Sequence, residues 1–304
     1  CGGKYVGSTD VFDTWMDSSI SPLYNTFWER DPKAFERLYP MSMRPQSHDI
    51  IRTWAYYTIL RSLHLTGKKP WDEVMIHGFI MAPDGRPMHT SDGNVIDPMP
   101  LLDKYGGDAM RYYAATCSLG MDHAFKEQEL VRGSRLATKT WNVMRMVGGA
   151  CKDKPSKPAA MHPVDAWVLS RFGRLVREAE ARCEAFEFDR TMALIQEFLW
   201  HEFADHYLEL VKHRAYADKD EGARYALYTV GLGLLKMVSV FLPHVAEDSY
   251  QHNFRTHEQP VSIHVSPWPE APQQDEEAER KGEAVKDVVA AVRAWKAAKG
   301  MSLN

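Results

Sequence analysis

Two short segments in the first third of the chain hold residue types from which ligand-binding sites are built. Segment 45–49 contains the carboxylate of Asp49, and segment 81–94 contains His89 and neighbouring hydroxyls. Imidazoles and hydroxyls can contact phosphate, although a hydroxyl carries no charge and a neutral histidine donates only one hydrogen bond. We therefore expect the chemistry in these two segments.

Two predicted strands bring these segments to one edge of a sheet. Residues 39–44 are typical of a strand that ends at Pro45, and residues 73–80 are rich in β-branched and apolar side chains. The second run is closed by the turn at 83–85, Pro-Asp-Gly, a composition typical of tight turns. In parallel sheets ligands bind beyond the carboxyl ends of the strands.

A helix is predicted between the two strands. Ser47 can cap it, Asp49 lies in its first turn and Gly67 can end it. Strand, helix and strand in that order predict a parallel α/β unit. The helix should bury the apolar residues that recur at helical spacing, namely Ile50, Trp54, Tyr57 and Leu60.

After residue 120 the pattern changes to long amphipathic helices. Apolar residues occupy nearly every face between 227 and 242, so that helix is expected at the centre of a bundle. A last helix carries an apolar stripe on one side: Val285, Val288, Val292 and Trp295. Two further stripes are predicted to be core: Val168, Phe172, Leu175, Ala179 and Cys183, then Phe188, Met192, Ile195, Leu199 and Phe203.

The composition fits a protein of two domains with a sizeable core, since 44% of the 304 residues are hydrophobic and 26% are charged. No apolar run approaches the ~20 residues that span a bilayer, and no basic-then-apolar leader opens the chain. We therefore expect a cytoplasmic protein with no membrane partner. The net charge of −4 gives no general affinity for nucleic acid, so RNA binding would need local basic patches.

The four cysteines are too scattered for a disulfide framework, and none forms a CxxC pair. Cys117, Cys151 and Cys183 are expected to be reduced and packed as small hydrophobes. Cys1 opens the run Cys-Gly-Gly-Lys, where a zinc knuckle of the CxxCGGK kind would finish. One cysteine cannot hold zinc, so no metal site is predicted.

Four stretches, taken in order and spacing, resemble the valyl branch of the class I aminoacyl-tRNA synthetases. The second differs in isoleucyl and leucyl enzymes, which disfavours those branches without excluding them. The third falls where the family carries its KMSKS signature. The stretches are Asp10–Ser19 (DVFDTWMDSS), Arg44–Trp54 (RPQSHDIIRTW), His77–Pro98 and Lys104–Tyr112 (KYGGDAMRY). Residues 139–142 resemble the family's domain junction, and 198–214, 242–247 and 262–269 resemble its anticodon-binding bundle.

The resemblance implies an α/β part followed by an all-α part. Residues 1–120 would be the second half of a Rossmann-like, parallel-sheet aminoacylation domain that contains the signature loop. Residues 121–161 would be junction helices, and 162–304 a helix-bundle anticodon-binding domain. The chain would then be the carboxyl-terminal part of such an enzyme.

The resemblance also implies an activity and its site residues. The full enzyme would activate valine with ATP, with Mg²⁺ accompanying the nucleotide, and transfer it to tRNA(Val) in protein biosynthesis. Substrate-binding roles fall on Trp15, Gln46, Asp49 and Trp54, and nucleotide-binding roles on His48, His77, Gly78, Phe79 and Met88. The tryptophans would form the apolar walls of the valine pocket, and Asp49 would hold the α-ammonium group or the ribose.

Each of these roles has a plainer alternative. The tryptophans can be core residues, and Asp49 can be a charge that only stabilises its helix. The adenine role of the backbone at 77–79 rests on Gly78, because a glycine at a strand end permits a close approach to the backbone. The side chain of His77 can merely pack or cap.

The signature loop departs from the family's pattern. Pro87 and Thr90 stand where the two lysines of KMSKS neutralise charge on the phosphates in the transition state. Catalytic contacts would be left to His89, Thr90 and Ser91, with Arg86 nearby. We predict weak or absent adenylate formation.

Two further departures leave the function open. The printed sequence has no HxGH run, and it has no room for the family's inserted editing domain. One interpretation is a fragment of a longer synthetase, which alone would be inactive. The alternative is a non-catalytic tRNA-binding paralogue.

Basic residues at helical spacing are candidates for tRNA binding. Cations that recur on one helix face can follow a phosphate backbone. A solvated charged face is the alternative explanation for such runs. The candidates are Arg132, Arg135, Lys139, Arg171, Arg174, Lys212 and Arg214.

Overall fold

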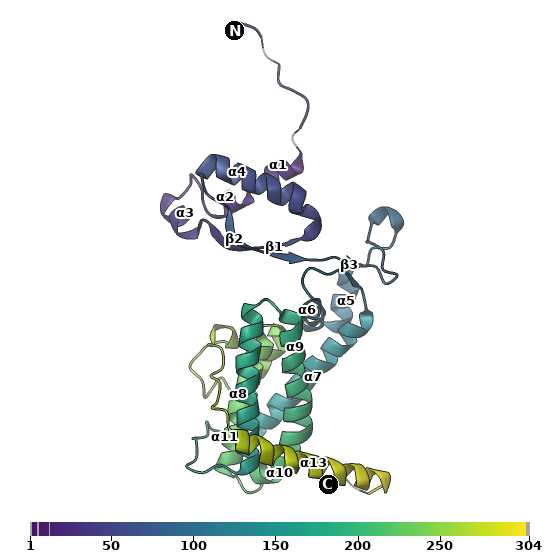
Figure 1. Cartoon of the computed structure of the whole chain (residues 1–304), viewed down its shortest axis with the longest axis vertical. Helices are drawn as coiled ribbons and strands as arrows, with labels where there is room; N and C mark the ends of the chain where they lie inside the picture. The colour runs from purple at the N-terminus through teal and green to yellow at the C-terminus, as the bar shows by residue number, and fades with distance from the viewer. Residues whose placement is uncertain (1, 5, 12, 302–304) are drawn as a thin grey trace. The chain divides into compact units, whose positions relative to one another are not determined.

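The structure, a computed structural model, describes residues 2–4, 6–11 and 13–301. They divide into two compact units, each of which can be followed in Figure 1. The strand unit runs to Val95 and includes Leu119–Phe125, and the helical unit holds Ile96–Ser118 and the residues from Lys126 onward. The helices between 98 and 115 therefore cluster in space with the helical unit, and the domain boundaries expected from the sequence, at 120 and 161, remain a prediction.

The strand unit contains two short parallel pairs. β1 (Met41–Ser47) pairs with β2 (Trp71–His77), and β3 (Ile80–Met81) pairs with β4 (His123–Ala124). In the first pair Ser47 lies opposite His77, so β1 and β2 end at the same edge. The prediction of a parallel α/β unit is confirmed.

β1 continues through Pro45, which the sequence had marked as its end. Proline cannot donate a backbone hydrogen bond, so it is tolerated in strands that have a free side. Among the described residues β1 pairs only with β2, and the missing N–H of Pro45 therefore costs little.

The chain between β1 and β2 is helical but not one regular α-helix. His48–Ile50 is a 3-10 turn, Ile51–Ala55 is a π turn, and α4 (Tyr56–Thr66) follows. Gly67 ends α4 with φ of +70°, as predicted. Ser47 makes no capping hydrogen bond, because the 3-10 turn replaces the α-helical start that was expected there. The other helices of the unit are α1 (Thr14–Ser18), α2 (Ser21–Asn25) and α3 (Pro32–Leu38).

The predicted buried face of this helical segment is only partly correct. Trp54 is buried, but Tyr57 and Leu60 are exposed, and the residues of α4 that are buried are Thr58 and Ser62. Thr58 can be buried because its hydroxyl donates to the carbonyl of Trp54 at 2.7 Å. Small side chains occupy the packed side of α4, and its large apolar side chains remain uncovered in this unit.

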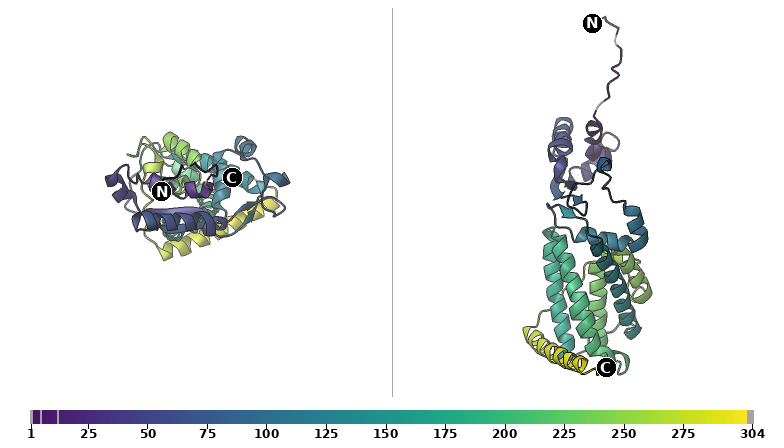
Figure 2. Two further views of the ribbon diagram at one scale, coloured as in Figure 1. Left: turned by 90° about the horizontal axis from the view of Figure 1, so that it is seen from above. Right: turned by 90° about the vertical axis from the view of Figure 1, so that its right-hand side faces the viewer.

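The helical unit is a bundle, and its helices run alongside one another in Figures 1 and 2. Short helices and a long one enter it: α5 (Pro98–Tyr105), α6 (Gly107–Ala115) and α7 (Glu127–Ala150). The remainder comprises α8 (Pro163–Glu184), α9 (Phe188–Glu197), a π-helical stretch η4 (Phe198–Tyr207), α10 (Leu208–Tyr216), α11 (Glu221–Ser239), α12 (Pro243–Asn253), a 3-10 turn η5 (Ile263–Val265) and α13 (Glu276–Ala298).

The core of the helical unit follows the sequence pattern closely. α11 is buried on nearly every face, which confirms its central position. The two predicted core stripes are buried except for Phe188 and Cys183, which are partly exposed. Burial raises the pKa of the Cys151 thiol to about 11, so this cysteine behaves as the small hydrophobe that was expected.

A buried carboxylate ties three helices of the bundle together. Asp165 on α8 is fully buried and accepts two hydrogen bonds from the Arg214 guanidinium, at 3.0 and 2.7 Å. The hydroxyl of Tyr207 donates to the same carboxylate at 2.9 Å. A buried charge is tolerated only when it is paired and hydrogen-bonded, and this one is.

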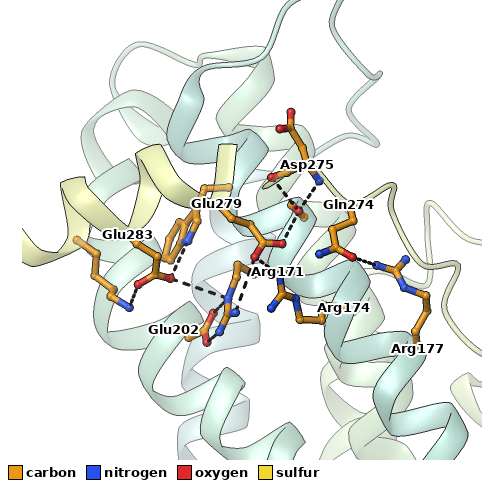
Figure 3. A network of polar contacts seen from close by, with 11 residues as sticks. Arg171, Arg174, Arg177, Glu202, Gln274, Asp275, Glu279 and Glu283 are labelled. Carbon is orange, nitrogen blue, oxygen red and sulfur yellow. Dashed lines mark hydrogen bonds and ion pairs between the residues drawn. The ribbon is translucent and has the colours of Figure 1, made fainter. Parts of the chain in front are cut away.

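α13 crosses α8 at one end of the bundle, and Figure 3 shows the polar contacts that hold it there. Glu279 is buried and accepts hydrogen bonds from Ser170 at 2.7 Å and from Arg174 at 2.5 Å. The indole N–H of Trp167 donates to Glu283 at 3.1 Å. The apolar stripe of α13, Val285, Val288, Val292 and Trp295, lies beyond this contact and is exposed.

No helix within the described ranges is both long enough and apolar enough to cross a membrane.

The close approach of α13 to α8 depends on Gly282, because a Cβ there would overlap the ring of Trp167. In an isolated helix glycine-to-alanine stabilises by about 1 kcal/mol. We expect Gly282→Ala to have the opposite effect and to speed amide hydrogen exchange across residues 276–283. Ala284→Ser, an exposed site on the same helix, serves as the control. Unchanged or slower exchange in the Gly282 variant would contradict this packing.

Candidate functional site

The ends of β1 and β2 are held together by one carboxylate from the segment 119–125. Asp122 Oδ1 lies 2.9 Å from Nε2 of His48, which follows β1. The same oxygen accepts the backbone N–H of Phe79, which follows β2, at 2.8 Å. The rings of His48 and Phe79 meet edge to face at 4.9 Å. The strand-end edge is thus a connected structure, which we call the Asp122 clamp.

The charge on Asp122 is stabilised by these contacts. The hydrogen bond from the Phe79 backbone, and after it the contact with His48, lower the pKa of the carboxyl group. Asp122 was not among the residues that the sequence singled out. Its role depends on the pairing of β3 with β4, and that pair is too short to be read from hydrophobic periodicity.

Gly78 allows a close approach, but of the chain's own backbone. A Cβ at this position would overlap the carbonyl oxygen of Met121. The side chain of His77 is exposed, and its Nδ1 lies 2.9 Å from the carbonyl of Gly78. This contact favours the alternative in which His77 caps the local backbone.

Polar atoms without partners gather where β1 ends. Gln46 is 3% exposed, and its side-chain Oε1 has no hydrogen-bond partner within the described ranges. The same holds for buried polar atoms of Arg44, Ser47 and Thr53. Most buried polar groups in proteins have a hydrogen-bond partner. Several buried atoms without one in a single segment therefore indicate that a bound ligand supplies the missing donors or acceptors. These four atoms mark the segment 44–53 as the most distinctive candidate site of the strand unit.

Trp54 does not present a free ring to this site. It is 8% exposed, stacks on Trp71 at 5.8 Å between ring centroids, and carries the Arg44 guanidinium 4.0 Å from its own ring centroid. The core alternative therefore describes Trp54 better than the pocket-wall prediction. Trp15 is 36% exposed on α1, which packs against the π turn that contains Trp54, and Asp49 is exposed.

The signature loop is held by Asn94. The Asn94 side chain accepts the His89 backbone N–H at 2.8 Å and donates to the Pro87 carbonyl at 2.9 Å. This leaves the side chains of His89, Thr90 and Ser91 exposed, whereas Met88 is partly buried. The loop therefore presents an imidazole and hydroxyls to solvent.

Most of the predicted tRNA-binding cations are already paired within the helical unit. Arg171 pairs with Glu202, Arg174 with Glu279, and Arg214 with buried Asp165, so these three hold helices together. Arg132 and Lys212 form exposed pairs with carboxylates one turn away. The sequence could not distinguish these cases, because a helical stripe of cations looks the same whether acids from another helix face it or not.

Arg135 and Lys139 line a cavity of about 580 Å³ between α7 and the η4–α10 segment. Lys139 bonds to Asp205 at 2.7 Å and lies 4.4 Å from the ring centroid of Trp200. Arg135 is exposed and has no ion-pair partner among the residues that the structure covers. We call this cavity the Trp200 groove.

Metal-ligand chemistry finds no support in the described part of the chain, where no group of three or more His, Cys, Asp or Glu residues could hold an ion. Cys1, at the possible zinc-knuckle position, lies outside the described residues.

Two regions of the chain match known protein families. Residues 2–126 match the tRNA synthetases class I (I, L, M and V), and residues 165–304 match the anticodon-binding domain of tRNA ligase. The valine–tRNA ligase of Pyrococcus furiosus is 40% identical over 100% of this chain, and that of Methanocaldococcus jannaschii is 41% identical over 100%. The chain belongs to the class I tRNA synthetases.

Solved synthetase structures share the fold. The agnB2 LeuRS of Agrobacterium radiobacter K84, in a ternary complex with tRNA and LeuAMS, superposes with a TM-score of 0.71 at 17% identity, covering 92% of this chain and 35% of that one. The methionyl-tRNA synthetase of Mycobacterium tuberculosis, in complex with methionyl-adenylate, gives 0.63 at 20% identity, covering 86% and 54%. The chain spans about 36% and 35% of the length of the two valine–tRNA ligases.

Within this synthetase chain the class I match covers the strand unit and also Ile96–Ser118 of the helical unit, and the anticodon-binding match lies in the helical unit. The class I match covers the strand unit with both sequence segments that were expected to hold the chemistry. The anticodon-binding match begins at Asp165, the buried anchor of the bundle, and includes α13. α7, with Arg135 and Lys139, lies between the two matched ranges.

A substitution at Gly78 tests the Asp122 clamp of this synthetase chain. We expect Gly78→Ala to displace the segment 119–125 from the strand ends, because the new Cβ and the Met121 carbonyl cannot occupy the same space. Amide exchange at Phe79, which donates to Asp122, should then accelerate. Gly85→Ala, in an open turn where a Cβ meets no neighbour but φ is +80°, controls for strain alone. Equal exchange at Phe79 in wild type and Gly78→Ala would refute the clamp.

Proposed function

We propose that this chain is part of a valine–tRNA ligase, which joins valine to ATP and transfers the valyl group to tRNA(Val). The observation that carries the proposal is the 40–41% identity to archaeal valine–tRNA ligases along the whole chain. The cluster of unpartnered polar atoms at the end of β1 supports the location of the site.

The amino acid would bind where β1 ends. Asp49 is exposed there and supplies the anion for the α-ammonium group, Gln46 supplies an unpartnered amide oxygen, and Trp15 supplies an exposed apolar ring. Trp54 would contribute indirectly, because its buried ring contacts the guanidinium of Arg44 and holds it in place. Burial lowers the pKa of Arg44, but an arginine stays charged under all ordinary conditions.

ATP would bind across the Asp122 clamp. His48 and Phe79 lie at the two strand ends, and the backbone at His77 and Gly78 lies between them. Met88, which is partly buried, directly precedes the exposed residues His89, Thr90 and Ser91 of the signature loop. Phosphates with their Mg²⁺ would face this loop, where His89, Thr90 and Ser91 offer hydrogen bonds and Arg86 offers a charge.

The loop limits the first step of the proposed reaction. Negative charge builds up on the phosphates as valine attacks ATP, and fixed positive charge stabilises that transition state. Arg86 is bonded to Asp84 at 2.7 Å, which partly neutralises it. With Pro87 and Thr90 at the two lysine positions, the chain has little positive charge at this place.

We predict slow valine-dependent exchange of pyrophosphate into ATP by the full-length protein. The double variant Pro87→Lys, Thr90→Lys should raise the rate at least ~100-fold, since removal of one such group typically costs about 10²–10³ in rate. Lys33→Met, remote in sequence, is the control. Wild-type exchange at ordinary synthetase rates would contradict the proposed role of the loop. Faster exchange with isoleucine or leucine than with valine would contradict the assignment to valine.

The Trp200 groove is the place in the helical unit best suited to RNA. Bases stack on aromatic rings and phosphates bind arginine and lysine, and the groove combines both. Arg135 is the cation that is not committed to a carboxylate. Arg132 and Lys212 would add weaker contacts, because their exposed ion pairs are easily exchanged.

Arg135→Met tests this surface. We expect weaker binding of a tRNA(Val) transcript and a salt dependence, d log K/d log[salt], shallower by about 1, as follows from the loss of one phosphate contact. Arg190→Met, an exposed arginine on α9 whose ion pair is local, is the matched control. If both variants bind the transcript as tightly as wild type, the groove is not an RNA site.

A second candidate function is tRNA binding without catalysis. The replacement of both signature lysines favours it. Tight binding of the transcript by full-length protein that shows no exchange with any amino acid would select this alternative.

A further inference from the structure

A second cavity of the helical unit has a lining that is rich in hydrogen-bond donors and contains no carboxylate. Its volume is about 490 Å³, and it lies between α6, the end of α11 and the segment 262–269. The charged and aromatic residues that line it are Arg111, Lys236, His264 and Trp268. Neither aspartate nor glutamate lines it, which separates it from the Trp200 groove, where Asp205 and Glu209 take part.

Lys236 is the principal cation of this cavity and lacks a partner. It is half-buried, and it makes no hydrogen bond or ion pair within the described residues. Burial lowers the pKa of its ammonium group, since the charged form has lost part of its hydration. Two acids act on it at longer range, Glu258 and, more weakly, Glu270, and Glu258 is already engaged by Lys154 and Tyr228, each at 2.7 Å. A half-buried ammonium in this state favours an incoming anion.

The end of α11 would ordinarily repel an anion, because a helix C terminus carries a partial negative charge. Arg111 removes this obstacle. Its guanidinium donates to the carbonyls of Val240 at 2.9 Å and Phe241 at 3.1 Å, just past the last turn of α11. The carbonyls at this edge of the cavity are therefore neutralised.

The wall formed by 262–269 adds polar groups that the chain does not satisfy. The hydroxyl of Ser266 and the indole N–H of Trp268 are buried without hydrogen-bond partners among the residues covered by the structure. The imidazole of His264 is exposed, with its Nε2 4.0 Å from a carboxylate oxygen of Glu247. Glu247 itself is occupied by Ser262 and by the backbone of Ile263. An oxyanion with several acceptor oxygens matches such a set of donors.

We propose that this cavity binds a backbone phosphate of the tRNA, with Lys236 as the cation that holds it and Arg111 as the positioning residue. The proposal rests on the proposed function, and it adds a contact at a place separate from the Trp200 groove. The size of the cavity leaves room for the nucleotide that carries the phosphate.

The test uses the full-length protein and the tRNA(Val) transcript. Lys236→Met keeps the length of the side chain and removes its charge. We expect the dissociation constant to rise about 5- to 10-fold and the salt dependence to become shallower by about 1, the value for one phosphate contact. Lys152→Met, an exposed lysine of the same unit, is the control and should change neither. The thermal midpoint of each variant shows whether it is folded.

A second measurement does not depend on substitution. Lysines of the wild-type protein are acylated with and without the transcript, and peptides are quantified by mass spectrometry. The transcript should protect Lys236 more than Lys152. Protection of Lys236 by millimolar inorganic phosphate, but not by the transcript, would overturn the proposal in favour of a small free ligand.

The outcomes separate this proposal from the proposed function. If Lys236→Met binds the transcript like wild type and Arg135→Met does not, the phosphate site is wrong and the RNA-binding function stands. If wild type itself does not bind the transcript, both fail.

Discussion

The two strand ends of the candidate site are held together by the carboxylate of Asp122. One oxygen receives the backbone N–H of Phe79 and contacts the ring of His48, so β1, β2 and the segment 119–125 are connected at a single atom. Gly78 makes the connection possible, because no side chain separates it from the Met121 carbonyl. Everything proposed for ATP depends on this constraint, since it fixes the edge where the two chemistry-bearing segments emerge.

The cationic side chains of the helical unit fall into two groups, those paired with acids from other elements and those without an ion-pair partner among the described residues. In the bundle, Arg171, Arg174 and Arg214 are matched by acids from other elements and serve the fold. Arg135 and Lys236 have no such match within the described residues, and they line cavities that differ in character. Under the proposed function, unmatched cations next to a cavity, and not the density of basic residues along a helix, mark the places where RNA would bind.

Much of the fold could be predicted from the sequence, because burial follows periodicity. The parallel strands, Gly67 as a helix end, and the central position of α11 were all readable in this way. The site was less accessible. The role of Asp122 comes from contacts between segments, and that of Asn94 from hydrogen bonds inside its own loop that no periodicity signals. The burial of Trp54 against Trp71 and Arg44 depends on the register of β1 and β2. The exposure of the apolar residues of α4 was not predicted either, because an apolar stripe on a helix does not show whether another part of the protein packs against it.

The central claim is that an aminoacyl-adenylate binds at the strand-end edge. This edge runs from Gln46 to Asp49 and across the Asp122 clamp. A thermal-shift titration of the full-length protein with a non-hydrolysable valyl-adenylate analogue tests it most directly, with Asp49→Asn measured in parallel. The account predicts a saturable rise in the melting temperature for wild type that is strongly reduced in Asp49→Asn, because the ammonium group loses its anion. No shift in wild type at saturating analogue, or the same shift in both proteins, would contradict it.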